Sequence, residues 1–160
     1  MTTKEPYTQE ISRATPACFL FLIDQSLSME ERIAGDGPPK CEQLASAINY
    51  WINAMIIKAT GDAGIKDWME IAVIGYTTDD DGNPIIGTAL GGELAGPSSE
   101  GFIKIGVFQK HPLRVSQKIQ QVVEAETSEI MELPVDVTEW IEPVAAKGTP
   151  MSHALMTAHA

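Results

Sequence analysis

An uninterrupted apolar run, Ala17 to Ile23 (Ala-Cys-Phe-Leu-Phe-Leu-Ile), constrains the fold more than any other feature of the sequence. Apolar and polar residues do not alternate within it, so both faces of the strand it predicts should be buried, as in the centre of a parallel sheet. A buried helical segment could give the same run, but the run is short and ends abruptly at Asp24. Trp68 to Thr77 predicts a second strand of the same kind, and Cys18 is expected to be a buried free thiol.

Helical spacing follows each of these predicted strands. A stripe of apolar residues predicts a helix from about Cys41 to Lys58, comprising Leu44, Ile48, Trp51, Ile52 and Met55. A second helix is predicted from about Val115 to Met131, with four residues facing inward: Ile119, Val122, Val123 and Ile130. A third begins at Met151, with Thr149 as its cap. The order of strands and helices predicts an α/β fold with a parallel sheet.

The segments between these elements are less regular. Residues 79–84 predict a turn, residues 85–108 an irregular edge strand with loops, and Val135 to Trp140 an extended piece. Residues 1–14 are polar and predict a loose lead-in before the domain, which spans residues 15–160.

Three oxygen-bearing side chains directly follow the first apolar run: Asp24, Ser26 and Ser28. Alternate residues of an extended loop point the same way, so one carboxylate and two hydroxyls converge. Such oxygens suit a hard cation such as Mg²⁺. A turn with capping side chains is the alternative interpretation.

Phe-Leu-Ile-Asp-Gln-Ser-Leu-Ser-Met resembles the first motif of the von Willebrand factor A (vWA) family, the metal-ion-dependent adhesion site. Lys147-Gly148-Thr149-Pro150-Met151 resembles the Gly-Thr-Pro-Met segment of bacterial members, and Ile71 to Tyr76 resembles the family's second strand. Together the matches span Ala17 to the C-terminus.

The resemblance implies a doubly wound, mostly parallel sheet with helices on both faces. It implies metal-mediated protein binding rather than catalysis, with Asp24, Ser26 and Ser28 as ligands of the first motif and Thr149 as the ligand of the second. The ion would be Mg²⁺, with Mn²⁺ or Ca²⁺ as alternatives, and it would bind an Asp or Glu carboxylate of a protein partner.

The family's third motif, an Asp after the next strand, has no counterpart before Ala160. In the family's topology that strand lies beside the first one, so Ala17 to Ile23 would otherwise present an apolar edge. The expectation is therefore an N-terminal portion of a vWA domain, either a fragment or a chain whose sheet a second chain completes.

Charge and composition bear on the kind of partner and on the compartment. The chain has 22 acidic residues against 11 Lys plus Arg, a net charge of −11, which argues against binding nucleic acid. Two cysteines are too few for a disulfide framework, and no signal peptide or membrane span is evident, so the cytoplasm is the expected compartment.

Other functions remain as alternatives. A structural or regulatory subunit with a vestigial metal site is one. A metal-dependent phosphotransferase is another, but it needs a second Asp two residues after Asp24, where Ser26 stands. A serine hydrolase lacks its Gly-x-Ser-x-Gly motif. Thr149 could be a helix cap only, and His153 and His159 are expected at the surface.

Overall fold

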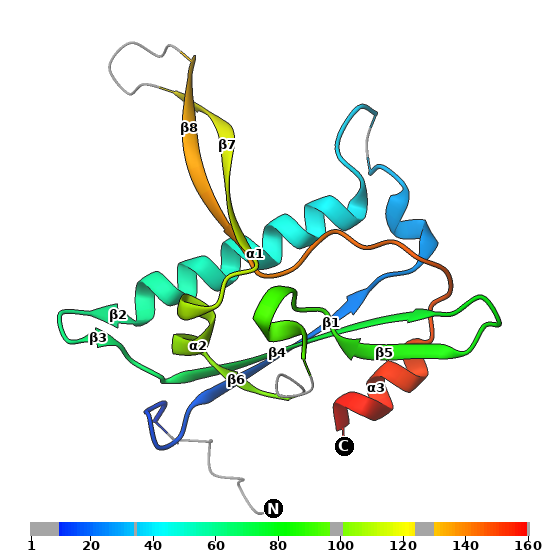
Figure 1. Cartoon of the computed structure of the whole chain (residues 1–160), viewed down its shortest axis with the longest axis horizontal. Helices are drawn as coiled ribbons and strands as arrows, with labels where there is room; N and C mark the ends of the chain where they lie inside the picture. Colours follow the sequence, from blue (N-terminus) through cyan, green and yellow to red (C-terminus); the bar gives the residue numbers. More distant parts are fainter. Residues whose placement is uncertain (1–9, 34, 97–100, 124–129, 160) are drawn as a thin grey trace, which may run out of the picture.

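The computed structural model describes residues 10–33, 35–96, 101–123 and 130–159. Within them the chain is a mixed α/β structure with a four-stranded sheet, one short and one long two-stranded hairpin, and three α-helices (Figure 1). The elements are β1 (Ala17–Asp24), α1 (Lys40–Ala59), β2 (Thr60–Gly61), β3 (Gly64–Ile65), β4 (Met69–Thr78), β5 (Pro84–Thr88), β6 (Ile103–Lys104), α2 (Ile105–Lys110), β7 (Arg114–Val123), β8 (Ile130–Glu139) and α3 (Met151–His159).

The sheet is built around β4. β1 pairs with β4 in parallel, from Ala17 opposite Met69 to Asp24 opposite Tyr76. β5 and β6 both pair with β4 in the antiparallel sense. The α/β class and the two predicted strands are confirmed, but the sheet is mixed, and β1 with β4 is the one parallel pair among the described residues.

The main core lies between the sheet and α1. Ile48, Ile52 and Ile56 of α1 are buried in one cluster with Ile71 and Val73 of β4. Phe19 and Phe21 of β1 meet the Trp51 ring, with centroids 5.1 and 5.0 Å away. This confirms the predicted first helix and its apolar stripe. Figure 1 shows α3, whose predicted start at Met151 is also confirmed, on the opposite face of the sheet.

The burial predicted for both faces of β1 is wrong at three positions. Cys18 is an exposed free thiol, and Phe19 and Leu20 are each 37% exposed. The reason is topological: in the part of the chain that the structure describes, β4 is the only strand beside β1. The edge of β1 away from β4 is therefore open, and apolar side chains lie along it.

The helix predicted from about Val115 to Met131 is also wrong. Residues 114–123 and 130–139 are instead an antiparallel hairpin, with Arg114 opposite Glu139 and Val123 opposite Ile130. Two residues expected to face inward are exposed, Ile119 at 64% and Ile130 at 66%. Apolar residues three and four apart fit a helix, but they are β-branched, which favours strands once a partner strand is available.

The connection between β4 and the hairpin contains more structure than predicted. β5 is the expected edge strand, and the predicted turn before it is confirmed, since the Asp79 carboxylate accepts hydrogen bonds from the backbone of Asp81 and Asn83. The short helix α2 was not predicted. No helix in the described ranges is long and apolar enough to cross a membrane.

Candidate metal centre

The predicted first motif forms a tight loop at the carboxyl end of β1. Asp24 is the last residue of the strand, and the chain then enters a short 3-10 helix, Leu27–Glu30. The Ser26 backbone N–H donates to Asp24 Oδ1 at 2.9 Å, and the hydroxyl oxygens of Ser26 and Ser28 are 3.1 Å apart. Ser26 is buried, whereas Asp24 is half-buried and Ser28 is exposed. The structure therefore brings these three side chains together at the surface.

The segment carrying the second predicted motif lies directly against this loop. The Ala146 N–H donates to the Gln25 carbonyl at 2.7 Å, and the Leu27 N–H donates to the Lys147 carbonyl at 3.0 Å. Thr149 follows two residues later and is exposed. Its hydroxyl has no hydrogen bond among the described residues, so the capping role predicted for it on α3 is wrong.

Two threonines at the end of β4 hold the second loop in place. Thr77 Oγ1 accepts the Lys147 N–H at 3.1 Å, and Thr78 Oγ1 accepts the Gly148 N–H at 2.8 Å. Gly148 packs so closely that an added Cβ would lie 2.6 Å from Thr78 Oγ1. Sequence reasoning missed both threonines; their position at the end of the strand beside β1 was the one available signal.

Two ionisable groups flank the loops. Tyr76 is buried opposite Asp24, and burial, followed by the negative charge of Asp24, raises the pKa of its hydroxyl. The Tyr76 hydroxyl, which is neutral near pH 7 even at the ordinary tyrosine pKa, therefore stays neutral to a higher pH. Lys147 forms an ion pair with Asp80 in the β4–β5 turn, which ties the second loop to that turn.

The two serine hydroxyls share a hydrogen bond, with their oxygens 3.1 Å apart. Adjacent octahedral ligands of Mg²⁺, each about 2.0–2.1 Å from the ion, are separated by a similar distance, about 2.9 Å. Asp24 Oδ1 is engaged in the turn, while Oδ2 has no hydrogen bond within the described residues.

A site of this composition differs from the common clusters of acidic and histidine ligands. No group of three or more His, Cys, Asp or Glu side chains that could hold a metal exists among the described residues. The candidate set contains one such side chain, Asp24, so an ion held here would depend on hydroxyls and water.

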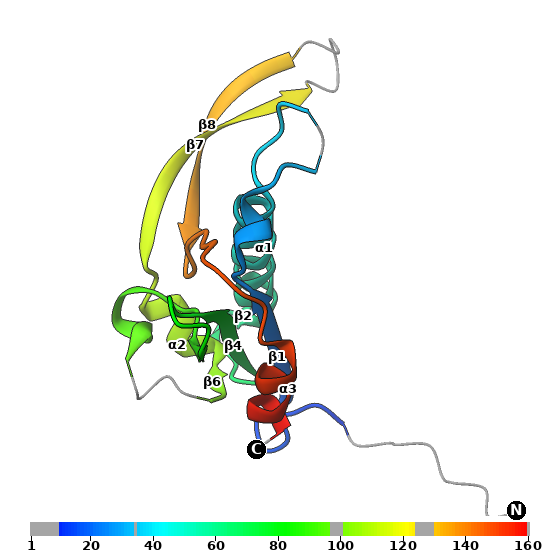
Figure 2. The same ribbon diagram turned by 90° about the vertical axis from the view of Figure 1, so that its right-hand side faces the viewer.

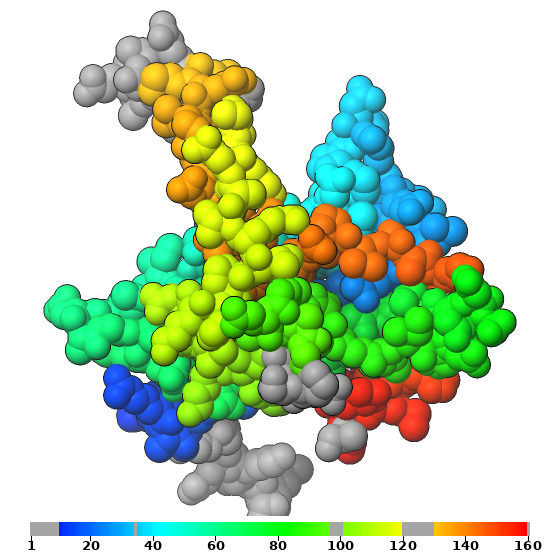
Figure 3. All heavy atoms as spheres, in the orientation of Figure 1, coloured from blue at the N-terminus to red at the C-terminus, as the bar shows by residue number. Residues whose placement is uncertain are grey.

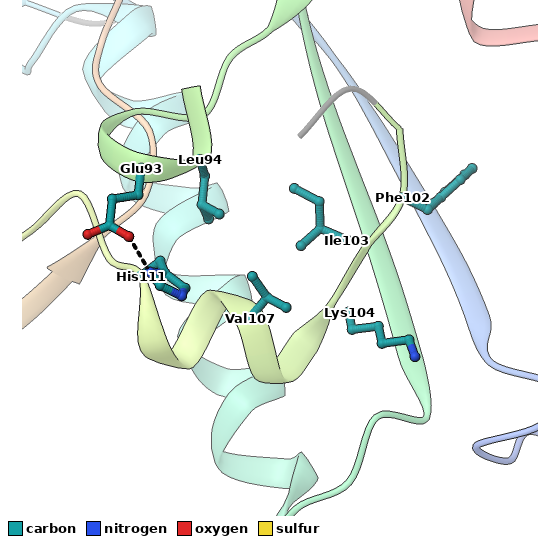
Figure 4. Close-up of a pocket in the computed structure, with 7 residues that line it drawn as sticks. All are labelled: Glu93, Leu94, Phe102, Ile103, Lys104, Val107 and His111. Carbon is teal, nitrogen blue, oxygen red and sulfur yellow. Dashed lines mark ion pairs between the residues drawn. The ribbon is translucent and has the colours of Figure 1, made fainter. Parts of the chain in front are cut away.

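A separate hollow lies between α2, β6 and the 3-10 helix Gly92–Ala95 (Figure 4). Its volume is about 380 Å³, and the Glu93 and His111 side chains point toward each other on its rim, 2.7 Å apart. Phe102 points away from the hollow. None of the predicted site residues lines it.

No family model, curated protein sequence or solved structure matches this chain. The resemblance to the vWA family therefore rests on the motif residues themselves.

Proposed function

We propose that this chain is a vWA-type module of the bacterial cytoplasm that binds a protein partner through a divalent metal ion. Asp24, Ser26 and Ser28 from the first loop and Thr149 from the second would hold Mg²⁺, with Mn²⁺ or Ca²⁺ as alternatives. The observation that carries the proposal is the 3.1 Å separation of the Ser26 and Ser28 hydroxyls beside the Asp24 carboxylate.

The ligand set favours a carboxylate of the partner. One carboxylate and several hydroxyls leave a divalent ion with a net positive charge and with positions that water occupies. An Asp or Glu of another protein can replace such a water and neutralise the charge. The site faces solvent at Ser28 and Thr149, so a protein surface can reach it.

The surroundings support binding more than catalysis. A tyrosine hydroxyl is protonated near pH 7, the pKa of Tyr76 is raised further by burial and by Asp24, and Lys147 is paired with Asp80. Neither group is a ready general base at that pH. A phosphotransferase would need a carboxylate at the position that Ser26 occupies.

The open edge of β1 supports a second contact with a partner. Its unpaired backbone groups and the exposed Phe19 and Leu20 can accept a further strand. We propose that a strand of a second chain pairs there and completes the doubly wound sheet of the vWA type.

Calorimetric titration of Mg²⁺ and Mn²⁺ into the chain tests the metal site. We expect Asp24→Asn, which keeps an oxygen for the turn but loses the charge, to weaken binding by about tenfold or more, equivalent to about 1.4 kcal/mol. Asp62→Asn is the matched control, because Asp62 is exposed and lies in the turn between β2 and β3. Equal binding by both variants would contradict the proposal.

The proposed binding of a partner's carboxylate to the metal ion is tested with Mn²⁺ and with acetate as the carboxylate. Protein-bound Mn²⁺ should broaden the acetate methyl NMR signal beyond the effect of free Mn²⁺, and this excess should disappear with Asp24→Asn. A wild-type chain that is folded but binds neither ion would favour the alternative, a structural or regulatory subunit with a vestigial site.

A further inference from the structure

The β7–β8 hairpin, called the arm below (residues 114–123 and 130–139), projects from the body on the same side of the sheet as α1 (Figures 1 and 2). An isolated two-stranded hairpin is marginally stable in water. Its position therefore depends on how the body of the molecule holds its base.

Buried hydrogen bonds fix the base of the arm to α1 and α2. The Asn49 amide of α1 accepts the N–H groups of Trp140 and Ile141 and donates to the Ile141 carbonyl, at 2.8, 3.1 and 3.0 Å. Trp140 is fully buried, and its Nε1–H donates to the Phe108 carbonyl at 2.7 Å. The arm is thus preformed at its base, which lowers the entropic cost of binding a ligand beside it.

A cleft of about 390 Å³ lies between this base and α1. Glu42 and Ser46 line it from α1, and Ser116 and Lys118 line it from the arm. The Ser116 hydroxyl is buried and has no hydrogen-bond partner in the described part of the chain. Figure 3 shows an open recess between the arm and the segment that leads into α1.

An apolar row continues the cleft along the arm. Lys118 lies opposite Val135, so both side chains are on the cleft face, and the alternation of a strand places Leu133 and Met131 on that face too. Val135, Leu133 and Met131 are 36%, 43% and 39% exposed. The cleft and this row lie on the same face of the arm, and the two are together called the groove below.

The unpaired charge in the groove is negative. Arg114 is paired with Glu139 and Glu142, and Lys118 with Glu139. Burial raises the pKa of Glu139, but its hydrogen bonds and charge interactions with Lys118 and Arg114 outweigh burial and lower it, so this carboxylate stays ionised near pH 7. Glu42, in contrast, has no ion pair with any described residue.

We propose that this groove binds a basic, amphipathic segment of a protein partner. A Lys or Arg of that segment would meet Glu42, a polar donor would meet the Ser116 hydroxyl, and apolar side chains would cover Met131, Leu133 and Val135. The net charge of −11 favours a basic partner and disfavours a second copy of this chain. The proposal does not depend on the metal site.

A fluorescein-labelled amphipathic peptide of Leu and Lys is a suitable probe, with fluorescence anisotropy measured in EDTA so that the metal site plays no part. We expect Leu133→Asp to weaken binding by about tenfold, equivalent to about 1.4 kcal/mol. Ile119→Asp is the matched control, because it adds the same charge to an exposed residue on the opposite face of the arm. It should leave the affinity within about twofold of wild type, a change below about 0.5 kcal/mol.

The same peptide with Glu in place of Lys should not bind. The Glu42→Gln substitution should weaken binding of the Lys-containing peptide. Thermal unfolding of both Asp variants checks that each remains folded. Equal effects of Leu133→Asp and Ile119→Asp, or equal binding of the two peptides, would overturn the proposal.

Discussion

Single polar residues hold together parts of this chain that are far apart in sequence. Asn49 is the main example, since its buried amide satisfies three backbone groups at Trp140 and Ile141. In the sequence it is an unremarkable polar residue beside an apolar stripe. Its importance follows from burial, because a backbone N–H or carbonyl that loses its partner away from water is costly.

We predict that Asn49→Ala lowers the free energy of unfolding by about 2–4 kcal/mol, because it leaves three buried backbone groups unpaired. Urea unfolding followed by circular dichroism measures the change. Asn53→Ala, one turn later in α1 and without a hydrogen bond to its side chain in the described structure, should change the stability by less than about 1 kcal/mol. Equal losses in the two variants would mean that the contacts of Asn49 are unimportant.

The two loops of the candidate metal centre form a unit at the scale of elements. The second loop is fastened to the first through Gln25 and Leu27, and to β4 through Thr77 and Thr78. These hydrogen bonds keep the segment before Thr149 close to Ser26. The position of the predicted second-motif ligand thus depends on residues that are not ligands themselves.

We predict that Gly148→Ala displaces the second loop, because its Cβ would lie 2.6 Å from Oγ1 and 2.8 Å from Cγ2 of Thr78. The expected loss of unfolding free energy is about 1–3 kcal/mol. Adding Thr78→Ala removes both clashing atoms and should recover part of that loss in a double-mutant cycle. Gly87→Ala is the control, since nothing lies within 4 Å of its added Cβ. A cycle without coupling between positions 148 and 78 would refute the steric explanation.

At the scale of the whole molecule, the edge strand β1 of the four-stranded sheet is the important feature. β1 has α1 on one face and α3 on the other, yet its edge away from β4 has no partner strand among the described residues (Figure 1). Open apolar edges pair with other strands, and a lysine on such an edge discourages this. The edge is therefore the proposed contact for a second chain, and we predict that the isolated chain self-associates through it.

We predict that Leu20→Lys reduces concentration-dependent association of the isolated chain, measured by sedimentation velocity. Ile33→Lys adds the same charge to an exposed apolar residue outside the sheet and should leave association as it is in the wild type. Equal reduction by both substitutions would attribute the effect to net charge instead of to the β1 edge.

The sequence by itself predicted β1, α1 and β4, because their apolar runs and stripe are local patterns whose length and spacing favour strand, helix and strand. It also placed Asp24, Ser26 and Ser28 together, since they are neighbours in the chain. Only the tertiary structure determined that the arm is a hairpin. The apolar spacing from Val115 onward fits a helix, and its β-branched residues fit a strand, so the pairing of residues 114–123 with residues 130–139 selects the strand. The tertiary structure also decided the contacts of Asn49 with Ile141, 92 residues away, and of Thr78 with Gly148, 70 residues away. Such contacts form only when distant segments pack together, so no local sequence pattern predicts them.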